Sequence, residues 1–131
     1  MAGFTDYLED KVLDHVFGGS SYSAPGTLYV GLFTAAPSDT GGGTEVSGGS
    51  YARKSMAAMT VSGTSPTTAT NGAAVEFVTA TGSWGTITHT GIFDASSSGN
   101  LLCWAALSAS KVVASGDVIR FDAGDLDVTL A

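Results

Sequence analysis

The chain has 131 residues, of which 44% are hydrophobic and 13% charged, and its formal net charge is −7. This length fits one domain with a sizeable core, and so low a content of charged residues indicates a surface that neighbouring subunits partly cover. The acidic balance argues against nucleic acid as a partner, because neutralising phosphates requires clustered lysine and arginine.

A short amphipathic helix is predicted at the N-terminus. Thr5 or Asp6 can cap it, and Glu9, three residues after Asp6, completes a pattern that resembles a capping box. Gly18 and Gly19 are expected to end it. Its apolar residues recur at helical spacing and form one stripe: Leu8, Val12, Leu13, Val16 and Phe17. Because a helix this short is marginal alone, we expect the stripe to dock on the rest of the domain or on a neighbouring subunit.

The rest of the chain predicts β-strands separated by turns. Thr27–Thr34 is apolar on both faces, as expected of a central strand that is covered on both sides. A long loop rich in glycine, serine, threonine and proline follows at Ala35–Ser50. A hairpin is predicted at Ser83–Leu107, with its turn at Ala95–Asn100. Shorter strands are predicted at Tyr51–Ser62, Ala74–Val78, Asp117–Phe121 and Leu126–Leu130, the last two as a pair. The polar stretch Gly63–Gly72 separates the first two of these.

The order of these elements predicts the fold class. In the first strand of the hairpin, one face is expected to carry Ile87, His89, Gly91 and Phe93. About seven short strands with turn signals between them, and no alternation of strands with helices, predict a mainly β fold. The expected architecture is a single antiparallel β-sandwich, jelly-roll-like, with one short N-terminal α-helix. The helix belongs to residues 1–19 and the sandwich domain to residues 20–131.

Few residues are candidates for catalysis. His15 falls near the end of the helix, where a cation is favourable. Ser83, His89 and Asp94 could be combined into a triad, but nothing like a nucleophile elbow surrounds Ser83. For His89 we prefer a hydrogen-bonded strand histidine at a subunit contact. The glycine-rich part of the loop Ala35–Ser50 has no lysine placed for phosphate binding. The sequence therefore predicts no catalytic residue and no cofactor, and a protein that is not an enzyme.

Metal and sugar binding are the remaining chemical alternatives. Asp122, Asp125 and Asp127 could bind calcium, but they lack the spacing of an EF-hand loop. The alternation of Asp125 and Asp127 with apolar residues is also the ordinary pattern of a strand, so no metal site is predicted. Trp84 and Trp104 could line a sugar site, as in a carbohydrate-binding module, but such residues are more often core or interface anchors.

The chain has a single cysteine, Cys103, inside the apolar run Leu101–Leu107. It is expected to be a small buried hydrophobe, and it permits neither an intrachain disulfide nor a cysteine-based zinc site. The first ten residues lack the basic and long apolar segments of a secretory signal, and no apolar run approaches the length of a bilayer span. We therefore expect synthesis in the cytoplasm and no membrane partner.

Several short motifs follow one another along nearly the whole chain: Tyr7–His15, Phe17–Gly19, Leu28–Phe33, Gly49–Arg53, Ala80–His89, Gly91–Asp94, Gly99–Leu102 and Ser115–Asp117. In this order and spacing they resemble a family of small tailed-phage virion proteins, usually labelled tail-fibre-like (the gp80 type). The resemblance implies a structural protein of the virion, made in the host cytoplasm. It brings no catalytic residues with it.

Two structural functions are compatible with this resemblance. The sequence contains no internal repeat and no heptads, whereas a tail fibre usually needs a trimeric shaft. A compact domain with one helix and flexible loops favours a capsid decoration (cement) protein, acting as a homotrimer that contacts the major capsid protein. The alternative is a tail, baseplate or tail-fibre-associated subunit that contacts tail proteins and can reach a receptor or glycan. Residues expected at an interface are Leu8, Val12, Val16, Phe17, Tyr51, Arg53, Trp84 and His89.

Overall fold

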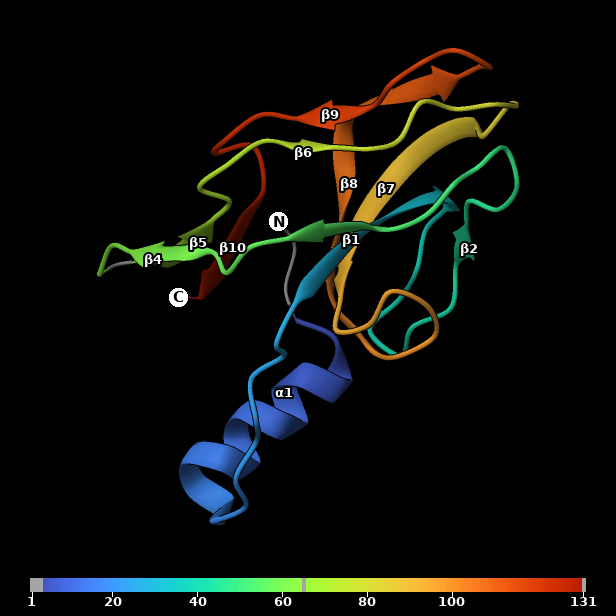
Figure 1. The fold of residues 1–131 in the computed structure, drawn as a ribbon. Helices are drawn as coiled ribbons and strands as arrows, with labels where there is room; N and C mark the ends of the chain where they lie inside the picture. The colour runs from blue at the N-terminus through green and yellow to red at the C-terminus, as the bar shows by residue number, and fades with distance from the viewer. Residues whose placement is uncertain (1–3, 65, 131) are drawn as a thin grey trace.

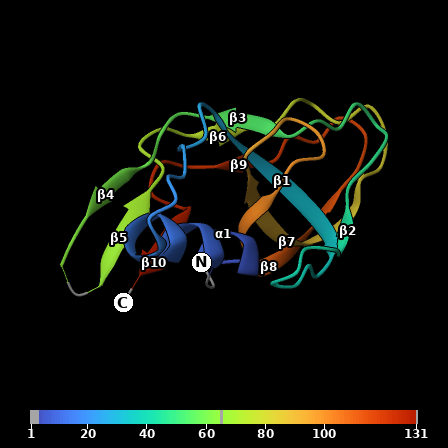
Figure 2. The same cartoon turned by 90° about the horizontal axis from the view of Figure 1, so that it is seen from below.

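The computed structural model describes residues 4–64 and 66–130. The ranges predicted for the helix (1–19) and for the sandwich domain (20–131) therefore include residues 1–3, 65 and 131, which lie outside the described residues. One helix precedes a body of antiparallel strands (Figures 1 and 2). The helix α1 (Asp6–Leu13) continues into one π-helical turn, η1 (Asp14–Gly18). The strands are β1 (Leu28–Ala35), β2 (Thr44–Glu45), β3 (Lys54–Met56), β4 (Thr60–Ser62), β5 (Thr67–Thr70), β6 (Val75–Glu76), β7 (Gly85–Phe93), β8 (Leu101–Val113), β9 (Arg120–Phe121) and β10 (Asp127–Leu130).

The strands form three antiparallel sheets. The central sheet has the order β2–β1–β7–β8, and β3 pairs with the first half of β1. A small sheet of order β10–β5–β4 lies to one side of it in both views, and β6 pairs with β9 (Figures 1 and 2). The predicted fold class is confirmed: mainly β, antiparallel, with one short N-terminal helix. The hairpin predicted at Ser83–Leu107 is also confirmed, as β7 and β8. The jelly-roll connectivity stays a prediction.

The main core lies on one face of the central sheet. Val30 and Leu32 of β1 are fully buried there, and Leu102 and Cys103 of β8 join them. The opposite side of this core is supplied by the segment around β6 and by β9, through residues such as Phe77. The cover predicted for β1 is therefore confirmed on this face, since the alternate residues Leu28, Val30 and Leu32 belong to the core or pack against it.

The other face of the central sheet carries a thinner apolar layer. Phe33, Phe93 and Leu101 are buried there, and the rings of Phe33 and Phe93 stack with centroids 5.9 Å apart. Gly31 of β1 stands directly opposite Gly91 of β7. A Cβ on Gly31 would lie 2.7 Å from the Phe93 ring, and one on Gly91 would lie 2.6 Å from Leu101. The glycine pair thus lets large side chains lie flat on the sheet, which confirms that β1 is covered on both sides.

We expect the Gly31→Ala substitution to destabilise the domain by about 1–3 kcal/mol, the usual cost of overpacking a filled core. The added methyl group meets a ring that cannot rotate away, because Phe93 is itself covered by Arg53 at 3.4 Å. Urea unfolding followed by far-UV circular dichroism measures the change. The matched control is Gly26→Ala, where nothing lies within 4 Å of the new Cβ, and no loss is expected. Equal stability of the two variants would contradict this account of the glycine pair.

The helix is fixed to the domain at its first residues. Thr5 caps α1 and is buried, and its hydroxyl donates hydrogen bonds to the carbonyl oxygens of Leu101 and Leu102 at 2.6 and 3.1 Å. The backbone nitrogen of Thr5 donates to Leu102 at 2.9 Å, and Phe4 forms an antiparallel bridge with Cys103. Gly19 ends the helix in the left-handed conformation, with φ of 80°. The predicted cap and the predicted end are both confirmed, and the far end of the helix projects away from the strands (Figure 1).

The C-terminal strands pair differently from the prediction. Residues 117–121 and 126–130 do not pair with each other, because β9 pairs with β6 and β10 with β5. The physical reason is the buried amide of Asn71, which accepts hydrogen bonds from Gly124 at 3.1 Å and Leu126 at 2.9 Å. It also donates to the carbonyl oxygen of Asp122 at 2.9 Å. The turn between β9 and β10 is thereby tied to the β5–β6 segment, and its two flanks reach different sheets.

Several strand boundaries also differ from the prediction. Tyr51–Ser62 forms two separate strands, β3 and β4, and the loop Ala35–Ser50 contains β2. The polar stretch Gly63–Gly72 contains β5, and Leu101–Leu107 extends to Val113. Ile87 was placed wrongly on the face of His89: it is buried in the main core instead. The reason is a register shift between β7 and β8 at Ile87/His89, which rotates the two parts of the strand relative to each other.

Candidate functional site

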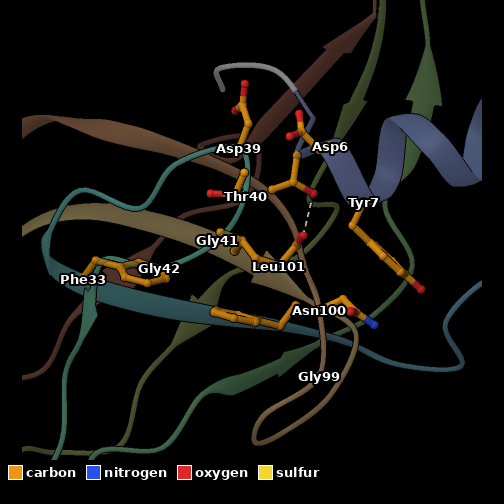
Figure 3. A pocket seen from close by; sticks show the side chains of 12 residues that line it. Asp6, Tyr7, Phe33, Asp39, Thr40, Gly41, Gly42, Gly99, Asn100 and Leu101 are labelled. Atoms are coloured by element: carbon orange, nitrogen blue, oxygen red, sulfur yellow. Dashed lines mark hydrogen bonds between the residues drawn. The ribbon is translucent and has the colours of Figure 1, made fainter.

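A pocket of about 420 Å³ opens at the edge of the thinner apolar layer (Figure 3). It lies between the start of α1, the loop after β1 and the turn before β8, and Asp6 and Asp39 lie on one side of it with Phe33 on the other (Figure 3). The backbone nitrogen of Asp6 donates to the carbonyl oxygen of Asp39 at 2.9 Å, which holds the two segments together. The lining residues are Thr5, Asp6, Tyr7, Phe33, Asp39, Thr40, Gly41, Gly42, Phe93, Gly99, Asn100 and Leu101.

Most polar groups that line this pocket form hydrogen bonds within the domain. Thr5 is bonded to β8, as described above, and the Asn100 amide donates to the Asp94 carboxylate at 2.9 Å. Phe33 and Phe93 also line the pocket but are almost fully buried, so they offer a ligand little apolar surface. Among the described residues, no histidine, cysteine or lysine lines the pocket. The lining that the structure describes is polar and contains no nucleophile hydrogen-bonded to a base.

The hypothetical triad of Ser83, His89 and Asp94 is not joined by hydrogen bonds. The Nδ1 atom of His89 lies 2.8 Å from the Thr88 hydroxyl, and its ring packs on Trp104 with centroids 5.9 Å apart. The Asp94 carboxylate accepts two hydrogen bonds from Asn100, at 2.7 and 2.9 Å, and so closes the turn before β8. The Ser83 hydroxyl accepts from the backbone of Gly85 at 3.2 Å. Each residue has a local structural contact.

Tyr51 and Arg53 form a buried cluster with Glu45, a residue that the sequence analysis did not single out. Arg53 donates two hydrogen bonds to the Glu45 carboxylate, at 2.8 and 2.9 Å, and Tyr51 donates a third at 2.7 Å. Arg53 also donates to the carbonyl oxygens of Ala95 and Ser98 at 2.9 and 2.8 Å. Its guanidinium lies 3.4 Å from the centre of the Phe93 ring, and 8% of its side chain is exposed. The cluster fastens β2 and the β7–β8 turn onto the thinner apolar layer.

The two tryptophans occupy different environments. Trp84 is 4% exposed, and its indole nitrogen donates to the carbonyl oxygen of Gly49 at 2.9 Å. Trp104 is half-buried, and its indole nitrogen lies 3.4 Å from Asp39. A carbohydrate-binding platform requires an exposed aromatic face, which Trp84 does not present. Tyr51, Arg53 and Trp84 make contacts inside the domain, and their interface roles stay predictions.

The apolar stripe of the helix divides into two parts. Leu8 is half-buried and packs against the main core, and Val12 is also half-buried. Val16 is 61% and Phe17 81% exposed, and Leu13 is 59% exposed. The N-terminal part of the stripe therefore docks on its own domain, and the C-terminal part is left at the surface. The interface roles of Leu8, Val12, Val16, Phe17 and His89 stay predictions.

The C-terminal aspartates take part in turn and surface contacts. Asp125 accepts a hydrogen bond from the backbone of Asp122 at 2.9 Å, and Asp122 accepts one from Arg120 at 2.8 Å. Within residues 4–64 and 66–130, no group of three or more histidine, cysteine or acidic side chains is placed to hold a metal ion. In the same residues, no helix is long and apolar enough to cross a membrane.

Burial protects two ionisable groups from losing their protons. It raises the pKa of the Cys103 thiol to about 12 from 9.0, and with the hydrogen bond to Glu45 it raises the pKa of Tyr51 well above 10.0. In the unfolded chain both groups ionise near their ordinary pKa values. Above about pH 9 the unfolded state therefore binds fewer protons than the folded state, and stability falls as the pH rises.

We expect the free energy of unfolding to decline between pH 9 and pH 12, by up to about 1.4 kcal/mol per pH unit for each group. Urea titrations at a series of pH values measure this slope. Cys103→Ala removes the part that begins near pH 9, and Tyr51→Phe removes the part that begins near pH 10. A slope that is the same in wild type and both variants would show that these groups do not cause the decline.

Comparison with known proteins places the chain among phage proteins. A family model described as podophage GP4 fiber I protein gp80 (Gp80) matches residues 3–129. No curated protein matches the chain. The match covers nearly the whole chain, including the helix, both faces of the central sheet and the small sheet.

Proposed function

Because the chain belongs to the Gp80 family of podophage GP4 fiber I proteins, we propose that it is a non-enzymatic structural subunit of a phage tail fibre. The family match over residues 3–129 is the observation that carries this proposal. The described residues support its non-enzymatic part, since the side chains that could have formed a catalytic site are bonded to turns, strands and one another.

A fibre subunit is favoured over capsid decoration, the function that the sequence favours. Capsid decoration was favoured by the compact domain and by the lack of a repeat, but the family match supports a fibre better. A compact domain can serve a fibre as a joint or as a terminal piece, so a shaft within this chain is not required. Contact with a receptor or glycan stays a prediction.

Locating the chain on intact particles tests the proposal. Particles labelled with gold-conjugated antibody against the chain, or a cryo-electron microscopy map of the particle, are expected to show it at the tail in few copies. Density spread over the capsid shell in hundreds of copies would overturn the fibre proposal and restore capsid decoration.

Assays of the purified chain for hydrolysis of esters, peptides and glycosides are expected to show no activity above that of a Ser83→Ala, His89→Ala variant.

We also propose that the chain assembles as a trimer, and that the outer edge of β8 contributes to the contact. Beyond the bridge between Phe4 and Cys103, no strand within the described residues pairs with this edge. Ala106 and Ser108 of this strand are small and exposed. An unpaired edge of this kind is a ready site for pairing with another chain. Sedimentation equilibrium is expected to show three copies, and Ala106→Lys to give monomers.

A further inference from the structure

The end of the helix exposes a patch of apolar side chains that its own domain leaves uncovered. We use the name helix tip for Asp10, Leu13, Asp14, Val16 and Phe17. Leu13, Val16 and Phe17 are 59%, 61% and 81% exposed. Asp10, Leu13, Asp14 and Phe17, with Gly18, line a shallow groove of about 440 Å³. Large apolar residues clustered in this way mark an interaction surface more often than a free surface.

The helix tip stands clear of the strands. Figure 1 shows α1 leaving the body at its first residues, with its far end beyond every strand. The segment after Gly19 returns beside the helix, and the backbone of Tyr22 donates to Nδ1 of His15 at 2.9 Å. This contact orders the return segment and leaves Leu13 and Phe17 exposed. The helix tip is therefore held in place and presented outward.

The charges on the helix tip are of one sign. Asp10 and Asp14 line the same groove as Leu13 and Phe17. The basic group of the neighbouring Lys11 lies over the Tyr7 ring at 5.7 Å and reaches Asp10 only at 4.0 Å. A surface that buries the helix tip must accommodate two carboxylates beside the apolar side chains. Lysine or arginine at its rim would do so, because buried carboxylates need a paired charge.

A second copy of the chain does not offer such a surface. The chain has 12 acidic residues and 5 basic ones. Arg53 is enclosed with Glu45, and Arg120 pairs with Glu76 and Asp122. Within residues 4–64 and 66–130, this leaves Lys54 and Lys111 without an ion pair, on separate strands. Helix-to-helix contact between copies would bring Asp10 and Asp14 of each copy together and be repulsive.

We propose that the helix tip docks into an apolar groove rimmed by lysine or arginine on a different protein of the particle. The apolar side chains supply most of the affinity, and the two carboxylates set the orientation and make the attachment sensitive to salt. This inference rests on the proposed fibre function and names the kind of partner that the chain uses within it. The trimer contact at the β8 edge is a separate surface.

Binding of the purified full chain to particles from a phage that lacks its gene tests the proposal. We expect wild type to bind saturably, and Phe17→Ser to weaken binding by at least about tenfold. Asp10→Asn with Asp14→Asn is expected to weaken binding by about fivefold at low salt and to differ little from wild type at high salt. The matched controls are Val61→Ser on β4, where the side chain is 67% exposed, and the exposed Glu76→Gln, and both are expected to bind like wild type.

The outcomes separate this inference from the proposed function. If wild type and all helix-tip variants bind equally well, the chain is a particle protein and the helix tip is not its docking surface. If Phe17→Ser instead dissociates the oligomer of the free chain, the helix tip is a contact between copies, and the inference is overturned. If wild type does not bind the depleted particles, the inference is overturned, whereas the fibre function is decided separately by where the chain lies on intact particles.

Discussion

Replacing Arg53 with methionine is expected to destabilise the domain by about 3–5 kcal/mol, the range found when one partner of a buried ion pair is removed. The Glu45 carboxylate, 25% exposed, would keep only the hydrogen bond from Tyr51. The carbonyl oxygens of Ala95 and Ser98 would lose their donor, and the Phe93 ring its cover. Such a loss is a large part of the total stability of a small domain. Guanidinium chloride unfolding, followed by circular dichroism, measures it.

Two further variants separate the charge from the packing at this position. Arg53→Met combined with Glu45→Gln removes the unpaired carboxylate, and we expect it to recover part of the loss. The control is Arg120→Met, because Arg120 makes ion pairs at the surface and its side chain is 53% exposed; only a small change is expected there. A loss at Arg53 no larger than at Arg120 would show that the buried cluster does not hold the thinner apolar layer.

Trp84→Ala is the second substitution with a large expected effect, about 3–5 kcal/mol, as for other buried large-to-small changes. The indole packs edge-on against Tyr51 at 5.3 Å and against Phe77 at 6.5 Å between centroids. Its removal leaves a cavity between the central sheet and the segment around β6. Because Trp84 also bonds Gly49, the loop before β3 loses one of its attachments. Chemical unfolding followed by far-UV circular dichroism measures the loss.

Trp84→Phe and Trp104→Ala serve as controls for this prediction. Phenylalanine retains most of the packing, and the Gly49 carbonyl oxygen keeps the hydrogen bond from Thr81 at 3.0 Å, so we expect a smaller loss. Trp104 is half-buried on the other face, and its truncation should also cost less. A Trp84→Ala variant as stable as Trp104→Ala would contradict the placement of Trp84 in the core.

Local patterns in the sequence predicted the elements that depend on local chemistry. The cap at Thr5, the end at Gly19 and the two apolar faces of β1 follow from the residues of those segments alone. The pairing of β10 with β5 could not be predicted in this way. It depends on Asn71, whose partners in the β9–β10 turn lie more than 50 residues away, and on β5, a threonine-rich strand with no apolar alternation.

In the candidate sites, too, features that depend on neighbouring residues could be predicted, and features that depend on contacts between distant segments could not. The stripe from Leu8 to Phe17 was visible as a helical pattern, but its division into a docked part and an exposed part depends on where α1 meets β8. The Arg53–Glu45 pair joins two stretches of irregular appearance, and no sequence signal distinguishes it from surface charges. The Arg53 side chain is buried because it lies on the Phe93 ring, which itself lies flat on Gly31. That arrangement depends on the register between β1 and β7.

The way the helix is rooted determines how mechanical load would travel through the domain. Residues 6–27 leave the central sheet at Thr5, which is bonded to β8, and re-enter it at β1. A pull on the helix tip is therefore shared between two strands of one sheet, with β7 between them. To detach the helix from β8, that force must break the hydrogen bonds from Thr5 to Leu101 and Leu102 at the same time. It does not merely extend a flexible linker. An attachment made at the helix tip would thus behave as a stiff tether.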